Sequence, residues 1–349
     1  MNKKTTIYII ISTILVLVIL VIIVSYFHFK KEKYFYPKEY KMDLTPVSDT
    51  AETEKYGNKV GGHCYLASAT MLMKHFDPNI EFWEVYVYQG SAVSFNYYFP
   101  YGPNGGISAG PDDSGTASLL VAASNLGYTP HVRRQIIDKG TPWSSKKIKK
   151  LGGDFRTYFF NPPMDEYKQI ISSGIPIGTS GSPCLADYNV IEGYDEKNLF
   201  AIIPNPQDVN RTNPKISCSV GSGLTHLVFW FTPDGKKISN RELMFTMKNT
   251  VNESLEIMER YIKNLEEGVD IVNFELERFY SARKFATMYF REQGYNELAD
   301  GYEKSAEAFC ELTSIFPPDA NKYKSKIIAQ MKKVLKNERG LLKYWEAIN

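Results

Sequence analysis

The feature that most restricts this chain is an uncharged apolar run near its start, IYIIISTILVLVILVIIVSYF, residues 7–27. A helix of roughly twenty such residues spans the hydrocarbon core of a bilayer. No small-x-small cleavage site accompanies the run, so we expect an uncleaved, single-pass transmembrane anchor rather than a signal peptide. Lysines flank both ends and do not orient it. Because the anchor follows a short basic head, residues 1–6, we expect the globular part outside the cytoplasm.

The composition is typical of a globular protein, with 43% hydrophobic and 23% charged residues and a net charge of +2. A nearly neutral chain carries no general signal for binding nucleic acid, so we expect none as a partner. The glycine-rich stretch GPNGGISAGPDDSG, residues 102–115, lacks the lysine and the spacing of a phosphate-binding loop. We therefore expect no cofactor.

Four cysteines occur in the chain, Cys64, Cys184, Cys218 and Cys310. Their spacing fits no zinc-binding pattern, because the chain has no CxxC or HxxxH motif, so we expect no metal. An extracytoplasmic location would permit a disulfide, and Cys184 with Cys218 is the pair that we favour. The alternative is that both are buried thiols.

The composition and apolar spacing of the chain change twice after the apolar run. Residues 28–55 are charged and rich in turn-forming residues, which indicates a stalk or linker. Residues 56–239 alternate short apolar runs with glycine and proline, which favours an α+β domain. From 240 to 349 glycine and proline are scarce and long amphipathic periods appear, which predicts a helical bundle.

Apolar spacing and turn residues predict particular elements within these regions. Helices are expected over 65–76, 114–128 and in the first part of 164–178, which then runs into a strand. A hairpin is expected over 188–206 with its turn near 196–198, and a further strand precedes the turn at 234–235. Four bundle helices are expected near 240–267, 269–293, 296–315 and 319–347.

Cys64 stands where a glycine-rich loop meets the first of these helices, in the segment GGHCYLASATMLMKHF. The partial positive charge of a helix N-terminus stabilises a thiolate, and Gly61 and Gly62 allow another chain to approach the loop closely. This arrangement suits a cysteine nucleophile. A small apolar cysteine that begins a buried helix is the simpler alternative.

The wider order of motifs resembles the papain-fold family of bacteriocin leader peptidases, together with the butirosin-biosynthesis acyltransferase-like domains. The segment HCYLASATMLMKHF is similar to the family's nucleophile segment, and IISSGIPIGTSGSPCLADYNVIEGYDEKNLFAIIPNP is similar to the segment that carries its base and orienting residue. The resemblance covers about residues 56–206. It implies a papain-like cysteine-peptidase fold of the α+β class, with Cys64 as nucleophile.

The chain departs from the family pattern at the base. Alignment on the GYD motif puts Asp187 where the family has its histidine, and a carboxylate is a weak base for a thiol. Asn205 falls at the orienting position. Asn58, six residues before Cys64, falls where the family has an oxyanion-binding glutamine.

Another histidine of the chain could be the base. His226 begins an apolar strand after a Gly-Ser-Gly loop, as the histidine of a papain-type enzyme does, although a histidine at a strand end is more often structural. His63 precedes Cys64 and is expected to contact substrate together with Gly61 and Gly62. We expect structural places for His75 and His131.

These residues support two main hypotheses. The first is a membrane-anchored, papain-fold thiol hydrolase or acyltransferase that acts on a peptide or acyl substrate through Cys64, with His226 or Asp187 as base. The alternative is a catalytically degenerate papain-fold protein that binds a peptide or protein partner, which the missing histidine favours. A third, less favoured hypothesis is a structural membrane protein whose helical bundle recruits partners. The first two require Cys64 to open toward the strand that holds residues 187–193.

Overall fold

The computed structural model describes residues 13, 15–19, 34–55, 64–97, 106–109, 115–135, 145–158, 163–180, 188–204, 213–219, 227–271, 273–274, 276–313, 315 and 317–348. The chain divides into two units, Met1–Pro37 and Lys38–Asn349. In the first unit, residues 15–19 are helical and exposed. Among the described residues, the structure has no helix both long enough and apolar enough to cross a bilayer. Most of residues 7–27 lie outside that part, so the anchor remains a prediction.

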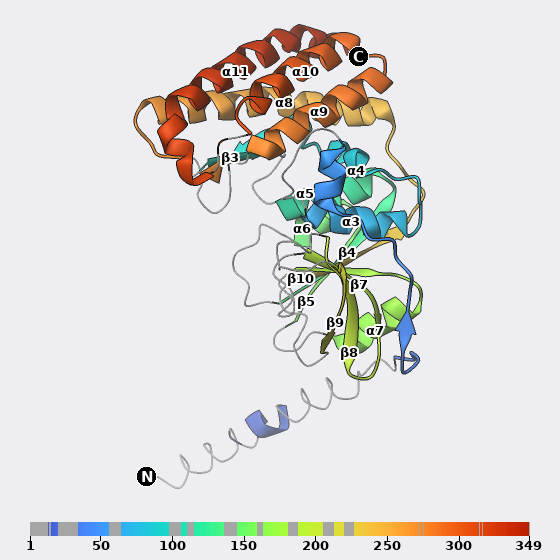
Figure 1. Cartoon of the computed structure of the whole chain (residues 1–349). Helices are drawn as coiled ribbons and strands as arrows, with labels where there is room; N and C mark the ends of the chain where they lie inside the picture. Colours follow the sequence, from blue (N-terminus) through green and yellow to red (C-terminus); the bar gives the residue numbers. More distant parts are fainter. Residues whose placement is uncertain are drawn as a thin grey trace, which may run out of the picture. The chain divides into compact units, whose positions relative to one another are not determined.

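The second unit contains a larger, mostly antiparallel sheet (Figure 1). Its strands are β1 (Tyr40–Lys41), β4 (Tyr128–Gln135), β5 (Asp154–Tyr158), β6 (Ile177–Ser180), β7 (Tyr188–Tyr194), β8 (Asn198–Ile202), β9 (Lys215–Ser219) and β10 (Leu227–Pro233). The strand order is β5-β4-β10-β6-β7-β8-β9, and β1 adds to β7. Only β4 and β5 are parallel among these pairs of described strands. The α+β class and the hairpin β7–β8 are thereby confirmed.

Six helices of the α/β part are described, and a small second sheet contacts the C-terminal helical region. The helices are α2 (Asp49–Glu54), α3 (Cys64–Lys74), α4 (Phe82–Tyr88), α5 (Gly115–Asn125), α6 (Ser145–Lys150) and α7 (Met164–Ser172). The small sheet consists of β2 (Phe95–Tyr97), β3 (Gly106–Ala109) and β11 (Asn273–Phe274). The predicted helices over 65–76, 114–128 and 164–172 are confirmed as α3, α5 and α7.

Helix α3 is buried more completely than its apolar spacing suggested. Every residue from Tyr65 to Met73 is buried, although the spacing indicated a single apolar face. The reason is that α3 contacts β6, β7 and β10 of the sheet as well as α4 and α5. A helix enclosed on several sides is apolar nearly all round, which explains the run of small and apolar residues after Cys64.

The two faces of the sheet carry different helices. Side chains alternate between faces along a strand, so Phe229 and its register partner Gly178 share one face with Tyr188. Tyr188 contacts Tyr65 of α3, which places α3 on that face. Helix α7 covers the opposite face, where its Glu166 binds Arg133 of β4. Helices α3 and α7 thus lie on opposite faces of the sheet.

The C-terminal region is helical, as predicted. Its helices are α8 (Asn240–Glu266), α9 (Leu276–Glu292), α10 (Asn296–Cys310) and α11 (Lys324–Glu346), with a 3-10 helix over Pro317–Tyr323. Ser239 begins α8 with a capping box to Glu242, and Gly268 and Gly294 have positive φ after α8 and α9. The expected start of the second helix at 269 is wrong, because residues 273–274 pair with β3 instead.

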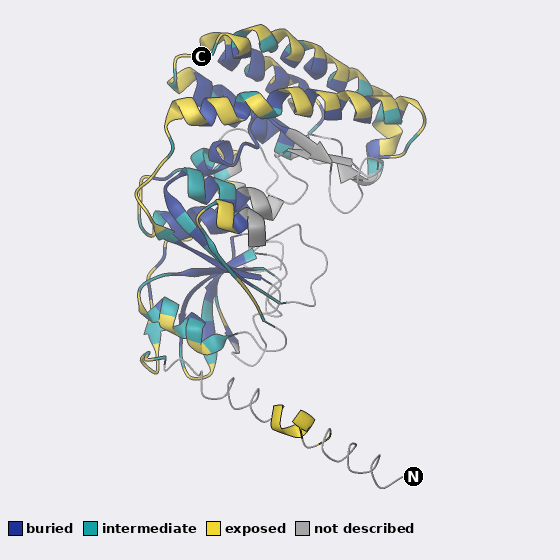
Figure 2. Cartoon of the chain, turned by 180° about the vertical axis from the view of Figure 1, so that it is seen from behind, coloured by how far each residue is buried: buried dark blue, intermediate teal, exposed yellow. Residues whose placement is uncertain are grey.

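The helical region packs against the α/β part within one compact unit. The ring of Phe285 in α9 contacts the rings of Phe82 and Tyr86 in α4. Arg283 donates a hydrogen bond to the carbonyl of Ala92, just after α4. Figure 2 shows buried residues on the inward faces of the C-terminal helices and exposed residues on their outward faces. The apolar faces of these amphipathic helices therefore pack against the α/β part as well as against one another.

Part of the segment expected as a stalk adds to the sheet. Strand β1 pairs with the end of β7, opposite Gly193, where a Cβ atom would lie 2.5 Å from the carbonyl oxygen of Tyr40. Glu192, whose side chain is 1% exposed, forms ion pairs with Lys41 and Lys215. Glycine at 193 and charge at 192 thus hold residues 40–41 against the sheet.

Candidate active site

Cys64 is the first residue of α3, as the sequence predicts. It is half-buried, in contrast to the sealed residues that follow it in the helix. Its neighbour Tyr65 makes an edge contact with Tyr188 at the start of β7, with 6.0 Å between ring centroids. From the helical region, the guanidinium of Arg278 lies 5.9 Å from the centroid of the Tyr65 ring. The start of α3 therefore meets the sheet and α9 at one place.

Strand register brings the beginnings of β7 and β10 to one edge of the sheet. Ser180, the last residue of β6, pairs with Tyr188 on one side and with Leu227 on the other. Since neighbouring strands are about 4.8 Å apart, Tyr188 and Leu227 are separated by roughly 10 Å. Strand β8 ends at the same edge, because its Ile202 pairs with Val190. The Tyr65 contact places the start of α3 beside this edge, which we call the site edge.

Most of the predicted site residues lie outside the described part of the chain. These are Asn58, Gly61, Gly62, His63, Asp187, Asn205 and His226. In the sequence, Asp187 directly precedes β7 and His226 directly precedes β10, while Asn205 follows β8 by three residues. The described ends of β7, β8 and β10 that are nearest to them in the sequence lie at the site edge. Their roles remain predictions.

The two described histidines have structural partners away from Cys64. His75 follows the far end of α3, about 16 Å along the helix from Cys64, and its Nε2 is 2.7 Å from the carbonyl oxygen of Gly174. The ring of His131 stacks on Trp230, and its Nε2 is 2.9 Å from the hydroxyl of Thr232. His131 lies within β4, in a structural place as expected. Neither histidine is placed to act on Cys64.

Two residues at the site edge were not found from the sequence. Tyr188 directly follows the position aligned with the family histidine, but no pattern indicates that its ring meets Tyr65. Arg278 lies in the helical region, more than two hundred residues after Cys64 in the sequence, and no local pattern links the two. Both contacts arise from the packing of distant segments.

No cluster of three or more metal-ligating side chains occurs within the part of the chain that the structure describes. The predicted partner of Cys218, Cys184, lies outside that part; Cys218 itself is buried in β9. The predicted disulfide therefore stays a prediction. The described contacts at the site edge join the Tyr65 ring, next to Cys64 in the sequence, to Tyr188 and to the guanidinium of Arg278.

No protein-family model matches this chain, and no curated protein matches it. What the structure defines is an α+β protein with a mostly antiparallel sheet, a helical C-terminal region and a cysteine at a helix N-terminus beside a sheet edge.

Proposed function

We propose that this chain is a membrane-anchored thiol enzyme of papain-like fold, which hydrolyses or transfers the acyl group of a peptide or acyl substrate. The observation that supports this most strongly is the position of Cys64 beside the site edge, where it is only partly buried, whereas the helix residues that follow it are sealed. A nucleophile needs access to substrate and groups on a second element to handle the proton. The resemblance described above supplies the fold and the reaction class of this proposal.

The proposed reaction has two steps. The sulfur of Cys64 attacks the carbonyl carbon of the substrate, its proton passes to the base, and the bond from that carbon to the leaving group breaks, which leaves a thioester. The leaving group departs with a proton from the base. Water or an acceptor then attacks the thioester carbonyl, which releases the acyl group and restores the thiol.

His226 is the proposed base. A free imidazole has a pKa of about 6.5, whereas a free aspartate has a pKa of about 3.9, so an imidazole accepts a thiol proton far more readily at neutral pH. Its neighbour Leu227 lies at the site edge, where it and Tyr188 pair with Ser180 from opposite sides. Asp187 is the alternative base, Asn58 the proposed oxyanion donor and Asn205 the orienting residue.

Alkylation by iodoacetamide tests the nucleophile. In the full-length chain we expect Cys64 to be alkylated at least tenfold faster at pH 7 than Cys310, which is exposed on α10 and serves as an internal control. Peptide mapping by mass spectrometry gives the two rates in one sample. Replacement Cys64→Ser should abolish the fast phase and leave the slow one. Equal rates at the two cysteines would overturn the proposal.

Substitution of the two candidate bases distinguishes the thiol enzyme from the catalytically degenerate binding protein. The aspartate at position 187, where the family has a histidine, favours the degenerate protein. If His226 is the base, His226→Ala slows the fast alkylation and Asp187→Asn leaves it nearly unchanged. The opposite result assigns the base to Asp187. Slow alkylation of Cys64 in the unaltered chain and in both variants, together with peptide binding, would indicate the catalytically degenerate protein.

A further inference from the structure

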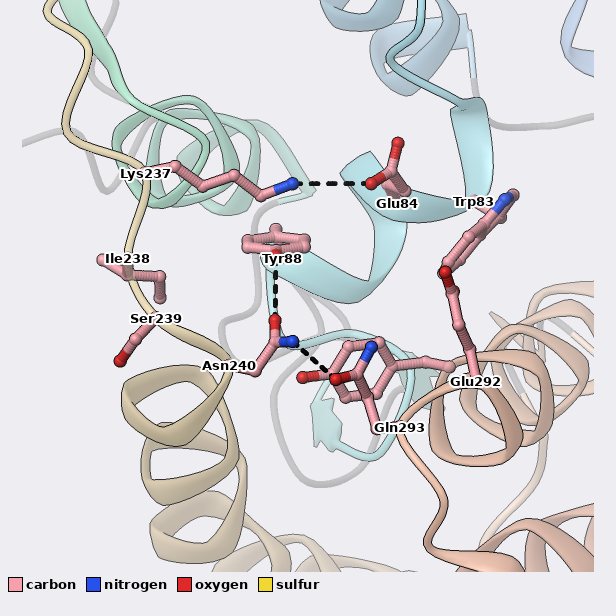
Figure 3. A pocket seen from close by; sticks show the side chains of 10 residues that line it. Trp83, Glu84, Tyr88, Lys237, Ile238, Ser239, Asn240, Glu292 and Gln293 are labelled. Atoms are coloured by element: carbon pink, nitrogen blue, oxygen red, sulfur yellow. Dashed lines mark hydrogen bonds and ion pairs between the residues drawn. The ribbon is translucent and has the colours of Figure 1, made fainter.

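A pocket of about 480 Å³ lies where three distant segments meet, apart from the start of α3. The segments are α4, the residues that lead into α8, and the end of α9. Figure 3 shows side chains from all three arranged around one space, with Tyr88 and Asn240 facing each other. The volume is within the range of small-molecule sites. The lining is mostly polar, in contrast to a typical apolar ligand pocket.

Several polar groups of the pocket already bind one another. The Nζ of Lys237 is 3.5 Å from Oε1 of Glu84 and 4.8 Å from the centroid of the Tyr88 ring. The hydroxyl of Tyr88 donates to Oδ1 of Asn240 at 3.4 Å, and Nδ2 of Asn240 donates to Oε1 of Gln293 at 2.5 Å (Figure 3). These contacts hold the pocket wall in place and neutralise its ammonium group.

Other polar groups of the lining have no such partner. Tyr289 is only 2% exposed, yet its hydroxyl has no hydrogen-bond partner among the residues that the structure describes. Such a buried polar group is unusual, since nearly all find a partner. Burial raises the pKa of Tyr289, so the hydroxyl stays protonated and can donate. Glu292 forms no ion pair with any described residue, and the Nε2 of Gln293 remains as a donor.

We infer that this pocket binds a small neutral saccharide. Vicinal hydroxyls of a sugar both donate and accept, so they can satisfy the carboxylate of Glu292 and the donors of Tyr289 and Gln293 together. The ring of the half-buried Trp83 offers a flat apolar surface for the C–H face of the sugar.

Charged ligands fit the lining less well. An anion would meet the carboxylates of Glu84 and Glu292, while Lys237, the one cationic side chain of the described lining, is already paired. A cation would leave the donors of Tyr289 and Gln293 unused, and the Tyr88 ring is already covered by the ammonium of Lys237. A neutral ligand with hydroxyl groups uses both kinds of available group.

Thermal unfolding and calorimetric titration of the full-length chain in detergent test this inference. The probes are glucose, N-acetylglucosamine, maltose and cellobiose, with choline chloride and sodium phosphate as charged comparisons. We expect at least one sugar to raise the melting temperature, because a ligand that binds only the folded state stabilises it. Neither charged probe should do so.

Two matched substitutions assign the binding to the pocket. Tyr289→Phe removes the unpartnered hydroxyl alone and should weaken sugar binding about tenfold, as expected for one lost hydrogen bond. Tyr167→Phe is the control, because the buried hydroxyl of Tyr167 likewise has no hydrogen-bond partner in the described part of the chain, and Tyr167 lies on α7 in the α/β part. It should leave binding unchanged.

Three outcomes would overturn the inference. The first is the absence of a thermal shift with every sugar. The second is sugar binding that Tyr289→Phe leaves intact, which would put the sugar elsewhere. The third is a larger shift with choline chloride that Glu292→Gln abolishes, which would make the pocket a cation site. None of these measurements depends on Cys64, so they are independent of the proposed reaction.

Discussion

At the residue scale, His131 shows how burial inside the sheet sets the charge of a side chain. Its ring stacks on Trp230 at 5.2 Å, and Arg133 lies 4.8 Å from the Trp230 ring. Burial lowers the pKa of His131, and this effect outweighs the nearby carboxylate of Asp154. The folded protein therefore favours the neutral form of the His131 imidazole more strongly than the unfolded chain does.

This difference predicts a dependence of stability on pH. A lowered folded-state pKa means that the unfolded chain binds the proton more tightly, so stability is lost as the pH falls below about 6.5, the unfolded value. We expect His131→Gln to lose less free energy of unfolding than the wild type between pH 7.5 and pH 5.5. Urea unfolding at the two pH values measures it. Equal losses in both proteins would show that other groups govern this range.

At the scale of elements, an ion pair joins α9 to α11. The side chains of Arg283 and Glu338 are 0% and 1% exposed, and they form a double contact with distances of 2.6 Å and 2.9 Å. Because Arg283 also donates to the carbonyl of Ala92, the pair links the helical region to the segment after α4. Arg339, which follows Glu338 in the sequence, instead forms an exposed ion pair with Glu259.

The two pairs predict very different costs of substitution. Glu338→Leu leaves a buried guanidinium without its partner and should lower the free energy of unfolding by about 3–5 kcal/mol. Glu259→Gln breaks a pair whose side chains are 46% and 54% exposed, and should cost less than about 1 kcal/mol. The double variant Arg283→Met/Glu338→Leu should recover much of the loss. Denaturant unfolding gives all three values, and equal costs for the single variants would contradict this account.

Helix α4 shows how packing can override local preference. Its sequence, FWEVYVY, consists mainly of aromatic and β-branched residues, which favour strands. The capping box between Glu81 and Glu84 begins a helix nevertheless, and five of its seven residues are buried, in part against the ring of Phe285. Local propensity alone would have assigned this segment wrongly, and with it one wall of the pocket that contains Trp83.

At the scale of the whole molecule, the chain divides into Met1–Pro37 and Lys38–Asn349, and the predicted anchor belongs to the first unit. We predict that the full-length chain stays with membranes after a wash in alkaline carbonate. The double variant Leu15→Arg/Val18→Arg should be released, because each charge near the centre of the run costs about 2.5–3.5 kcal/mol on insertion. Fractionation followed by immunoblotting measures it. Release of the unaltered chain would exclude the anchor.

Much of the local structure could be predicted because it depends on short-range signals. The capping box at Ser239, the glycines with positive φ at 127, 268 and 294, and the apolar spacing in α3 and α7 each act within a few residues. The same signals correctly put Cys64 at the start of a helix. Its predicted partners could be proposed only from the resemblance, and the described residues do not include them.

The amino-acid sequence by itself determined the helices, the hairpin and the position of Cys64, because caps, turns and apolar periods are written into neighbouring residues. Only the tertiary structure decided that β6 joins β7 to β10, that β11 pairs with β3, and that Arg278 reaches Tyr65. These contacts join segments far apart in the chain, and they form because burial of apolar surface outweighs the entropy lost when distant segments are held together.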